Sequence, residues 1–91
     1  MSLTYTQHTL EKLELLFKVL DYKVRYEKGN FKTGACMLES SRIIVVNKFS
    51  DLESRITALA ELLRSIAVDE TLLDEKQLKF LYTLKQTSLE F

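Results

Sequence analysis

The chain contains no proline and no tryptophan, and its 91 residues include one cysteine and one histidine. Cys36 alone cannot form an internal disulfide, and no charged-then-apolar signal peptide opens the sequence, so we expect a cytoplasmic protein. His8 and Cys36 together would supply two ligands, whereas a closed zinc site requires four. We therefore expect no metal site, no cofactor and no catalytic residues, and we expect Cys36 to be a small buried hydrophobic residue.

Charge of one sign is not in excess, because thirteen basic and thirteen acidic side chains cancel. This balance removes a global attraction to nucleic acid or anionic lipid. The distribution is uneven, since residues 18–48 carry seven basic and three acidic groups and residues 49–91 carry five and eight. Two interpretations remain open: the solvated faces of different elements simply differ, or a basic sheet meets an acidic helical surface of a partner or of a second copy.

Long hydrophobic runs are also missing. No uninterrupted apolar run is longer than that of residues 43–46, which is far short of the ~18 residues needed to cross a bilayer. We therefore expect no membrane association. With 46% hydrophobic and 29% charged residues, the composition is that of an ordinary globular protein, and the length predicts a single domain over residues 1–91 with frayed ends at 1–5 and 87–91.

Three segments have the periodicity of amphipathic helices, at residues 6–21, 51–67 and about 74–86. Thr4, Thr6 or Thr9 could cap the first. Ser50 and Glu53 form an S-x-x-E capping box at the start of the second, and Asp74 with Gln77 repeats this geometry before the third. All three helices should present one apolar stripe to a common core.

Between the first two helices the pattern becomes that of strands. Residues 22–27 alternate apolar and charged side chains, which predicts an edge strand. Lys28, Gly29 and Asn30 then predict a tight hairpin and an antiparallel return over residues 31–38. Residues 43–46 are apolar on both faces, so helices, or helices and another subunit, should cover both. The predicted fold class is α+β, in the order α-β-β-β-α-α, with a small three-stranded antiparallel sheet packed with helices.

Basic residues cluster on or around the predicted sheet, with Tyr22, Tyr26 and Phe31 between them. The candidate interaction surface consists of Lys23, Arg25, Lys28, Lys32, Arg42 and Lys48. Aromatic rings beside basic groups can stack single-stranded bases. Alternation, however, directs Val24 and Tyr26 away from Lys23 and Arg25, which places the rings toward the core and disfavours nucleic-acid binding.

One stretch resembles a known family. Residues 44–47 (I-V-V-N), followed by residues 55–64 (R-I-T-A-L-A-E-L-L-R), are similar to the strand and helix of the minimal gluzincin metallopeptidases of the IrrE/ImmA class, whose pattern is approximately I-x-[VI]-N and then F-T-L-A-H-E-L-G-H. Glu61 aligns with the glutamate, and Ala60 and Arg64 stand where that family has its zinc-binding histidines. Alanine has no lone pair to donate and a guanidinium is never deprotonated in a protein. The resemblance therefore implies a degenerate, inactive relative.

Together these observations predict a small cytoplasmic domain without catalysis that acts as a protein-interaction or self-association module, as a homodimer or with another protein. Two alternatives are a degenerate metallopeptidase-like protein and, more weakly, a single-stranded nucleic-acid binder that uses the basic sheet. The residues alone identify no particular partner or ligand.

Overall fold

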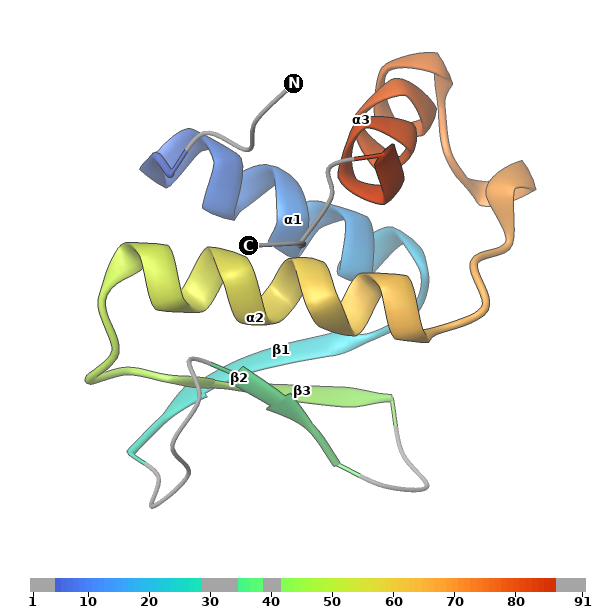
Figure 1. The fold of residues 1–91 in the computed structure, drawn as a ribbon. Helices are drawn as coiled ribbons and strands as arrows, with labels where there is room; N and C mark the ends of the chain where they lie inside the picture. The colour runs from blue at the N-terminus through green and yellow to red at the C-terminus, as the bar shows by residue number, and fades with distance from the viewer. Residues whose placement is uncertain (1–4, 29–34, 39–41, 87–91) are drawn as a thin grey trace.

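The computed structural model describes residues 5–28, 35–38 and 42–86 (Figure 1). The elements follow in the order α1 (Gln7–Val19), β1 (Lys23–Glu27), β2 (Ala35–Met37), β3 (Ile43–Asn47), α2 (Leu52–Ser65), the 3-10 helix η1 (Glu70–Leu72) and α3 (Glu75–Gln86). The predicted α+β class and the α-β-β-β-α-α order are confirmed. The short η1 lies in the polar interruption between the second and third predicted helices.

The sheet is mixed, and the prediction of an antiparallel sheet is wrong. Its strand order is β1-β3-β2, with β1 parallel to β3 and β2 antiparallel to β3. β1 and β2 are therefore not neighbours, so they do not form the hairpin predicted from Lys28, Gly29 and Asn30. Gly29, Asn30 and residues 31–34 of the expected return strand lie outside the described residues. β3 takes the central place because its run of apolar β-branched residues gains most from two neighbouring strands.

Helices cover one face of this sheet. Figure 1 shows α1 and α2 side by side on that face and α3 beyond them, away from the strands. α1 packs over β1, and α2 packs over β2. The prediction that helices cover both faces is not met in the described part of the chain, where all the helices lie on the same side of the strands.

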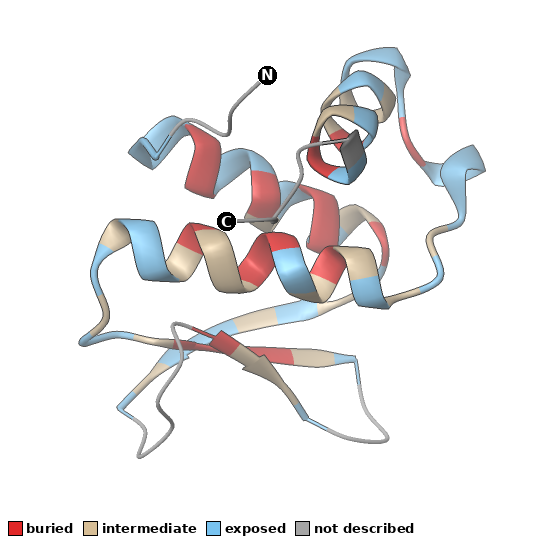
Figure 2. Cartoon of the chain, viewed as in Figure 1, coloured by how far each residue is buried: buried red, intermediate tan, exposed pale blue. Residues whose placement is uncertain are grey.

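The two faces of β3 have different surroundings. Ile44 and Val46 are fully buried and belong to the core between sheet and helices. Val45 points to the opposite, helix-free face and lies outside that core, although it is only 7% exposed. The other large core residues come from the three helices, whose ribbons carry buried segments in Figure 2: Leu10, Leu13, Leu16, Phe17, Ile56, Leu59, Leu63, Leu81 and Leu84.

Polar side chains and one unusual backbone conformation set the ends of α1. Thr6 is the N-cap, and its hydroxyl oxygen accepts a hydrogen bond from the Thr9 N–H at 3.2 Å. At the other end Asp21 adopts a positive φ of 70°, and the Tyr22 N–H donates to the Phe17 carbonyl at 2.8 Å. This closing pattern is usually built on glycine, but aspartate also tolerates the left-handed region. The chain thus turns into β1 without a glycine.

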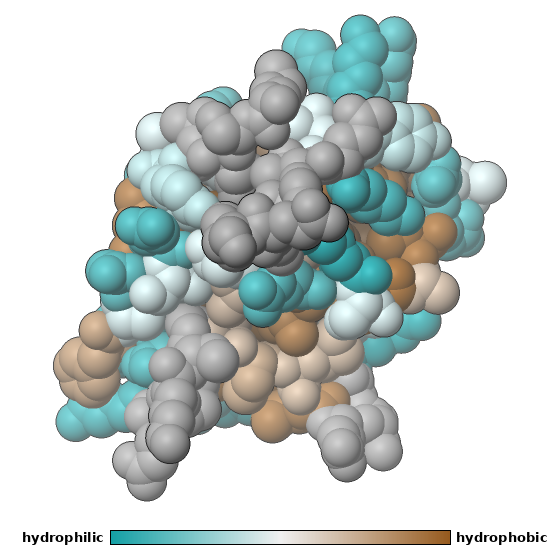
Figure 3. Space-filling view, viewed as in Figure 1, coloured by the Kyte–Doolittle hydropathy of each residue, from teal (hydrophilic) through white to brown (hydrophobic). Residues whose placement is uncertain are grey.

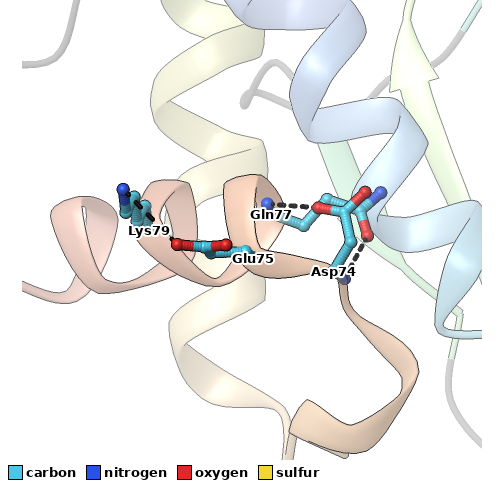
Figure 4. Close-up of polar contacts among 4 residues, drawn as sticks. All are labelled: Asp74, Glu75, Gln77 and Lys79. Carbon is cyan, nitrogen blue, oxygen red and sulfur yellow. Dashed lines mark hydrogen bonds and ion pairs between the residues drawn. The ribbon is translucent and has the colours of Figure 1, made fainter.

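The predicted start of α2 is wrong by one residue. Asp51 is the N-cap and accepts from the Ser54 N–H at 2.8 Å, whereas Ser50 donates its hydroxyl to the Asn47 carbonyl at 2.6 Å. Ser50 is therefore part of the turn that leaves β3. The capping box of α3 is confirmed (Figure 4), because Gln77 N–H donates to Asp74 at 2.8 Å and Asp74 N–H donates to Gln77 at 3.0 Å.

The observed N-cap of α2 predicts a larger effect on stability for Asp51 than for Glu53, two acidic residues at the start of this helix. Asp51→Ala should lower the melting temperature by several degrees, because the Ser54 N–H of the first turn loses its cap. Glu53→Ala should change it by less than half as much, since Glu53 is exposed and contributes through the helix dipole alone. Thermal unfolding followed by circular dichroism measures both. A larger loss for Glu53→Ala would restore Ser50 and Glu53 as the capping pair.

Candidate functional site

The six basic residues of the predicted interaction surface do not gather into one patch. Lys23 and Arg25 lie in β1, where alternation places them on the helix-free face with Val45. Lys28 and Lys48 follow the carboxyl ends of β1 and β3, whereas Arg42 precedes β3 at the opposite end of the sheet. Lys32 lies outside the described residues. A five-residue strand separates the two ends by about 16 Å, so one compact ligand cannot contact all of these groups.

Arg42 has a structural role. Its guanidinium donates to the Leu20 carbonyl at 2.9 Å and lies 5.2 Å from the centroid of the Tyr22 ring. Its own carbonyl accepts from the Lys23 N–H at 2.8 Å. Arg42 therefore ties the carboxyl end of α1 to the first residues of β1 and β3, where a positive charge also complements the helix dipole.

Tyr22, which precedes β1, and Tyr26 in β1 lie on the helix-covered side, as the alternation predicts. The Tyr22 ring packs edge-on against Phe17 at a centroid distance of 5.7 Å, and Tyr26 reaches the side of α1. Lys23 and Arg25 project from the other face. Among the described residues of β1, rings and cations are thus separated by the sheet, and they do not form a joint stacking surface for bases. Phe31 lies outside the described residues.

Tyr26 is the centre of a polar cluster formed by Glu14, Tyr26 and Arg55. The Tyr26 hydroxyl donates to the Glu14 carboxylate of α1, and the Arg55 guanidinium lies 5.4 Å from the Tyr26 ring centroid. Arg55 also donates to the Lys48 carbonyl at 2.8 Å. Burial, and then the bond to Glu14, raise the pKa of Tyr26 to about 12. The cluster holds a protonated phenol at neutral pH and joins β1 to both helices.

This cluster was not predicted from the sequence, because its members are distant along the chain. Twelve residues separate Glu14 from Tyr26 in the hydrogen bond, and Arg55 comes from a third element. The charge pattern of each helix alone shows no reason for the pairing. The signal that could have suggested it is the position of Tyr26 at the last apolar site of an edge strand, where a phenol needs a polar partner.

The residues that align with the peptidase pattern lie in different surroundings. Ala60 is buried in the core, and Glu61 is exposed on α2. Arg64 donates through Nε to the Leu84 carbonyl at 2.9 Å, which ties α2 to the end of α3. Glu61 therefore does not share a pocket with the side chains at positions 60 and 64. No group of three or more His, Cys, Asp and Glu residues suited to a metal ion occurs in the described ranges.

His8 and Cys36 are also far from each other in the fold. His8 is exposed near the start of α1, and Cys36 lies in β2 opposite Val45 on the helix-free face. Cys36 is partly exposed, so it is less buried than the sequence predicts. Within residues 5–28, 35–38 and 42–86, no helix combines the length and the apolar character needed to span a membrane.

The outer edge of β1 carries backbone groups that lack a strand partner. Lys23 N–H bonds Arg42 and Glu27 C=O accepts from Lys48, so the odd-numbered residues of β1 face β3. The N–H and C=O groups of Val24 and Tyr26 consequently point away from the sheet, and β1 is its outermost described strand. Beside this edge, Arg25 and Glu27 form an exposed ion pair of 2.6 Å.

No family model, curated protein or solved structure matches the chain. The resemblance to the minimal gluzincin metallopeptidases stays a prediction, carried by the residues quoted for it.

Proposed function

We propose that the protein is a non-catalytic interaction module that self-associates through the helix-free face of its sheet. The observation that carries this proposal is the one-sided helix cover: Ile43, Val45, Cys36 and Leu38 follow one another across a face on which no described helix packs. Val45 is only 7% exposed, but Ile43 and Cys36 are partly exposed and Leu38 is 41% exposed, and apolar side chains that gather on a face without helices mark a protein contact.

Hydrophobic surface is present at the β2 side of this face. Figure 3 shows apolar surface below α2, at the β2 edge of the sheet. On the helix-free face itself, Cys36 is partly exposed and Leu38 is 41% exposed. Charged residues of β1 border the strip on its other side, with Glu27 beside Lys23 and Arg25. A second copy whose strands run antiparallel to those of the first could place its Lys23 near Glu27 of the first copy. The chain is neutral, so no net charge repulsion opposes this contact.

The expected self-association is weak. Two strands of five residues and one of three cover at most roughly 14 by 16 Å, well below the ~800 Å² per partner of a standard stable interface. Light scattering should therefore give a mass near 10.6 kDa at low micromolar concentration and a rising average mass, toward twice that value, at several hundred micromolar. A reducing agent must be present so that Cys36 does not link two chains covalently.

A matched pair of variants locates the contact. Leu38→Lys should keep the chain monomeric at every concentration, because a charge would have to be buried against the second copy. Leu15→Lys introduces the same change at a 51% exposed position on α1 and should associate like the unmodified chain. Equal masses for both variants would exclude the helix-free face as the contact, and a constant mass of 10.6 kDa for the unmodified chain would exclude self-association itself.

A further inference from the structure

We infer that the outer edge of β1 is a second interaction site, which binds an extended segment of another protein with alternating acidic and apolar residues. The segment would add to the sheet as a fourth strand beside β1. This site is the backbone edge of β1; the side chains of Lys23 and Arg25 also border the helix-free face proposed for self-association, and each proposal has its own test.

The outer edge of β1 is a row of backbone donors and acceptors. Val24 and Tyr26 present N–H and C=O groups outward from an edge strand that contains no proline, glycine or bulge. Such a row is a template for one more strand, and strand addition is a recurring mode of peptide recognition. The hydrogen bond from Tyr26 to Glu14 holds the end of β1 against α1, so the edge is already ordered before a ligand arrives.

Sterics exclude a second copy of this chain from that edge. α1 packs over β1, and packed helices need an interaxial distance of about 8–10 Å. A two-fold pairing of β1 with β1 would place both α1 helices on the same face, separated by roughly the ~4.8 Å spacing of adjacent strands. The two helices would collide. A slender segment without its own helix has no such conflict.

The side chains define the chemistry of the segment. On the helix-free side, Lys23, Arg25 and Glu27 would stand opposite alternate residues of the added strand, and Arg25 already pairs with Glu27 at 2.6 Å. Carboxylates opposite Lys23 and Arg25 would form favourable cross-strand pairs. On the other side, Val24 and the partly exposed ring of Tyr26 favour apolar neighbours. The same two cations repel a basic strand, so the edge selects by repulsion as well as by attraction.

The probe is a blocked ten-residue peptide of alternating glutamate and valine, with an alternating lysine and valine peptide for comparison. Titration followed by NMR should shift the amide signals of Val24 and Tyr26 and slow their hydrogen exchange. The acidic peptide should bind about tenfold or more tightly than the basic one. A third peptide, acidic but N-methylated on alternate residues, lacks the donors that face β1 and should lose at least about tenfold in affinity.

Charge reversal in the protein provides the matched control. Lys23→Glu together with Arg25→Glu should weaken the acidic peptide by about tenfold or more and strengthen the basic one. Lys79→Glu reverses one exposed charge on α3, far from the sheet, and should leave both affinities unchanged. Circular dichroism verifies that each variant is folded.

Three results would overturn this inference: no binding of the acidic peptide at millimolar concentration, equal binding of the acidic and N-methylated peptides, or amide shifts that avoid β1. A chain that binds the peptide but stays monomeric would support the edge site and refute the self-association proposal. A chain that dimerises but does not bind the peptide would support the self-association proposal and refute the edge site.

Discussion

Phe17→Ala is expected to lower the free energy of unfolding by about 3–5 kcal/mol, the largest effect of any single replacement considered. The Phe17 side chain is fully buried and contacts Tyr22 at the junction of α1 and β1. Removing the ring leaves a cavity that α1 and the sheet cannot close without moving the hydrogen bond between Tyr22 and the Phe17 carbonyl. The total stability expected for 91 residues is roughly 5–14 kcal/mol, so the loss would remove between about a fifth and all of it.

Phe49→Ala is the matched control, because it removes the same ring from a position that is 68% exposed. Its described partner is the Lys28 ammonium, 5.9 Å from the ring centroid, and an exposed cation–π contact contributes about 1 kcal/mol at most. Urea unfolding of both variants gives the comparison. Similar midpoints would mean that Phe17 does not hold α1 on the sheet.

Helix positions were predictable because their signals are local. The apolar stripe of each helix and the reciprocal pair of Asp74 and Gln77 are written within one or two turns of sequence, and the structure retains them. The start of α2 was missed by one residue for a related reason. Ser50 and Asp51 are both competent caps, and the choice between them depends on whether the turn after β3 already uses Ser50.

Strand order was not predictable from the same kind of signal. Lys28, Gly29 and Asn30 have the chemistry of a tight turn, but turn chemistry does not decide which strand is central. Burial does: residues 43–46 are apolar on both faces and take the middle position, and the charged alternation of β1 suits an edge. Because β3 lies between β1 and β2, the neighbour of β1 is β3, and these two strands are parallel.

The candidate surfaces depend on this order. The six basic residues share a sequence region, but the sheet sends Lys23 and Arg25 to one face and uses Arg42 to anchor α1. The outer edge of β1 exists because β3, and not β2, is the neighbour of β1. A sequence pattern can give the composition of such a surface, whereas its position requires the topology.

The two faces of β3 should respond differently to the same truncation. Val46→Ala is expected to cost about 2–3 kcal/mol, because two methyl-sized groups are lost from a fully buried site enclosed by helices and a cavity remains. Val45 is 7% exposed, but its neighbours on the helix-free face are side chains of the strands with no described helix over them, so Val45→Ala should cost less, about 1–2 kcal/mol. Urea unfolding at low micromolar concentration measures both values for the monomer.

Repeating the Val45→Ala measurement at several hundred micromolar adds a test of the contact. If a second copy covers the helix-free face, association stabilises the unmodified chain by mass action and stabilises Val45→Ala less, so the difference between them grows with concentration. The cost of Val46→Ala should stay constant, because its site is enclosed within one chain. Equal growth for both variants would place the contact elsewhere, and a monomer cost of Val45→Ala as large as that of Val46→Ala would mean that the helix-free face is packed as tightly as the core.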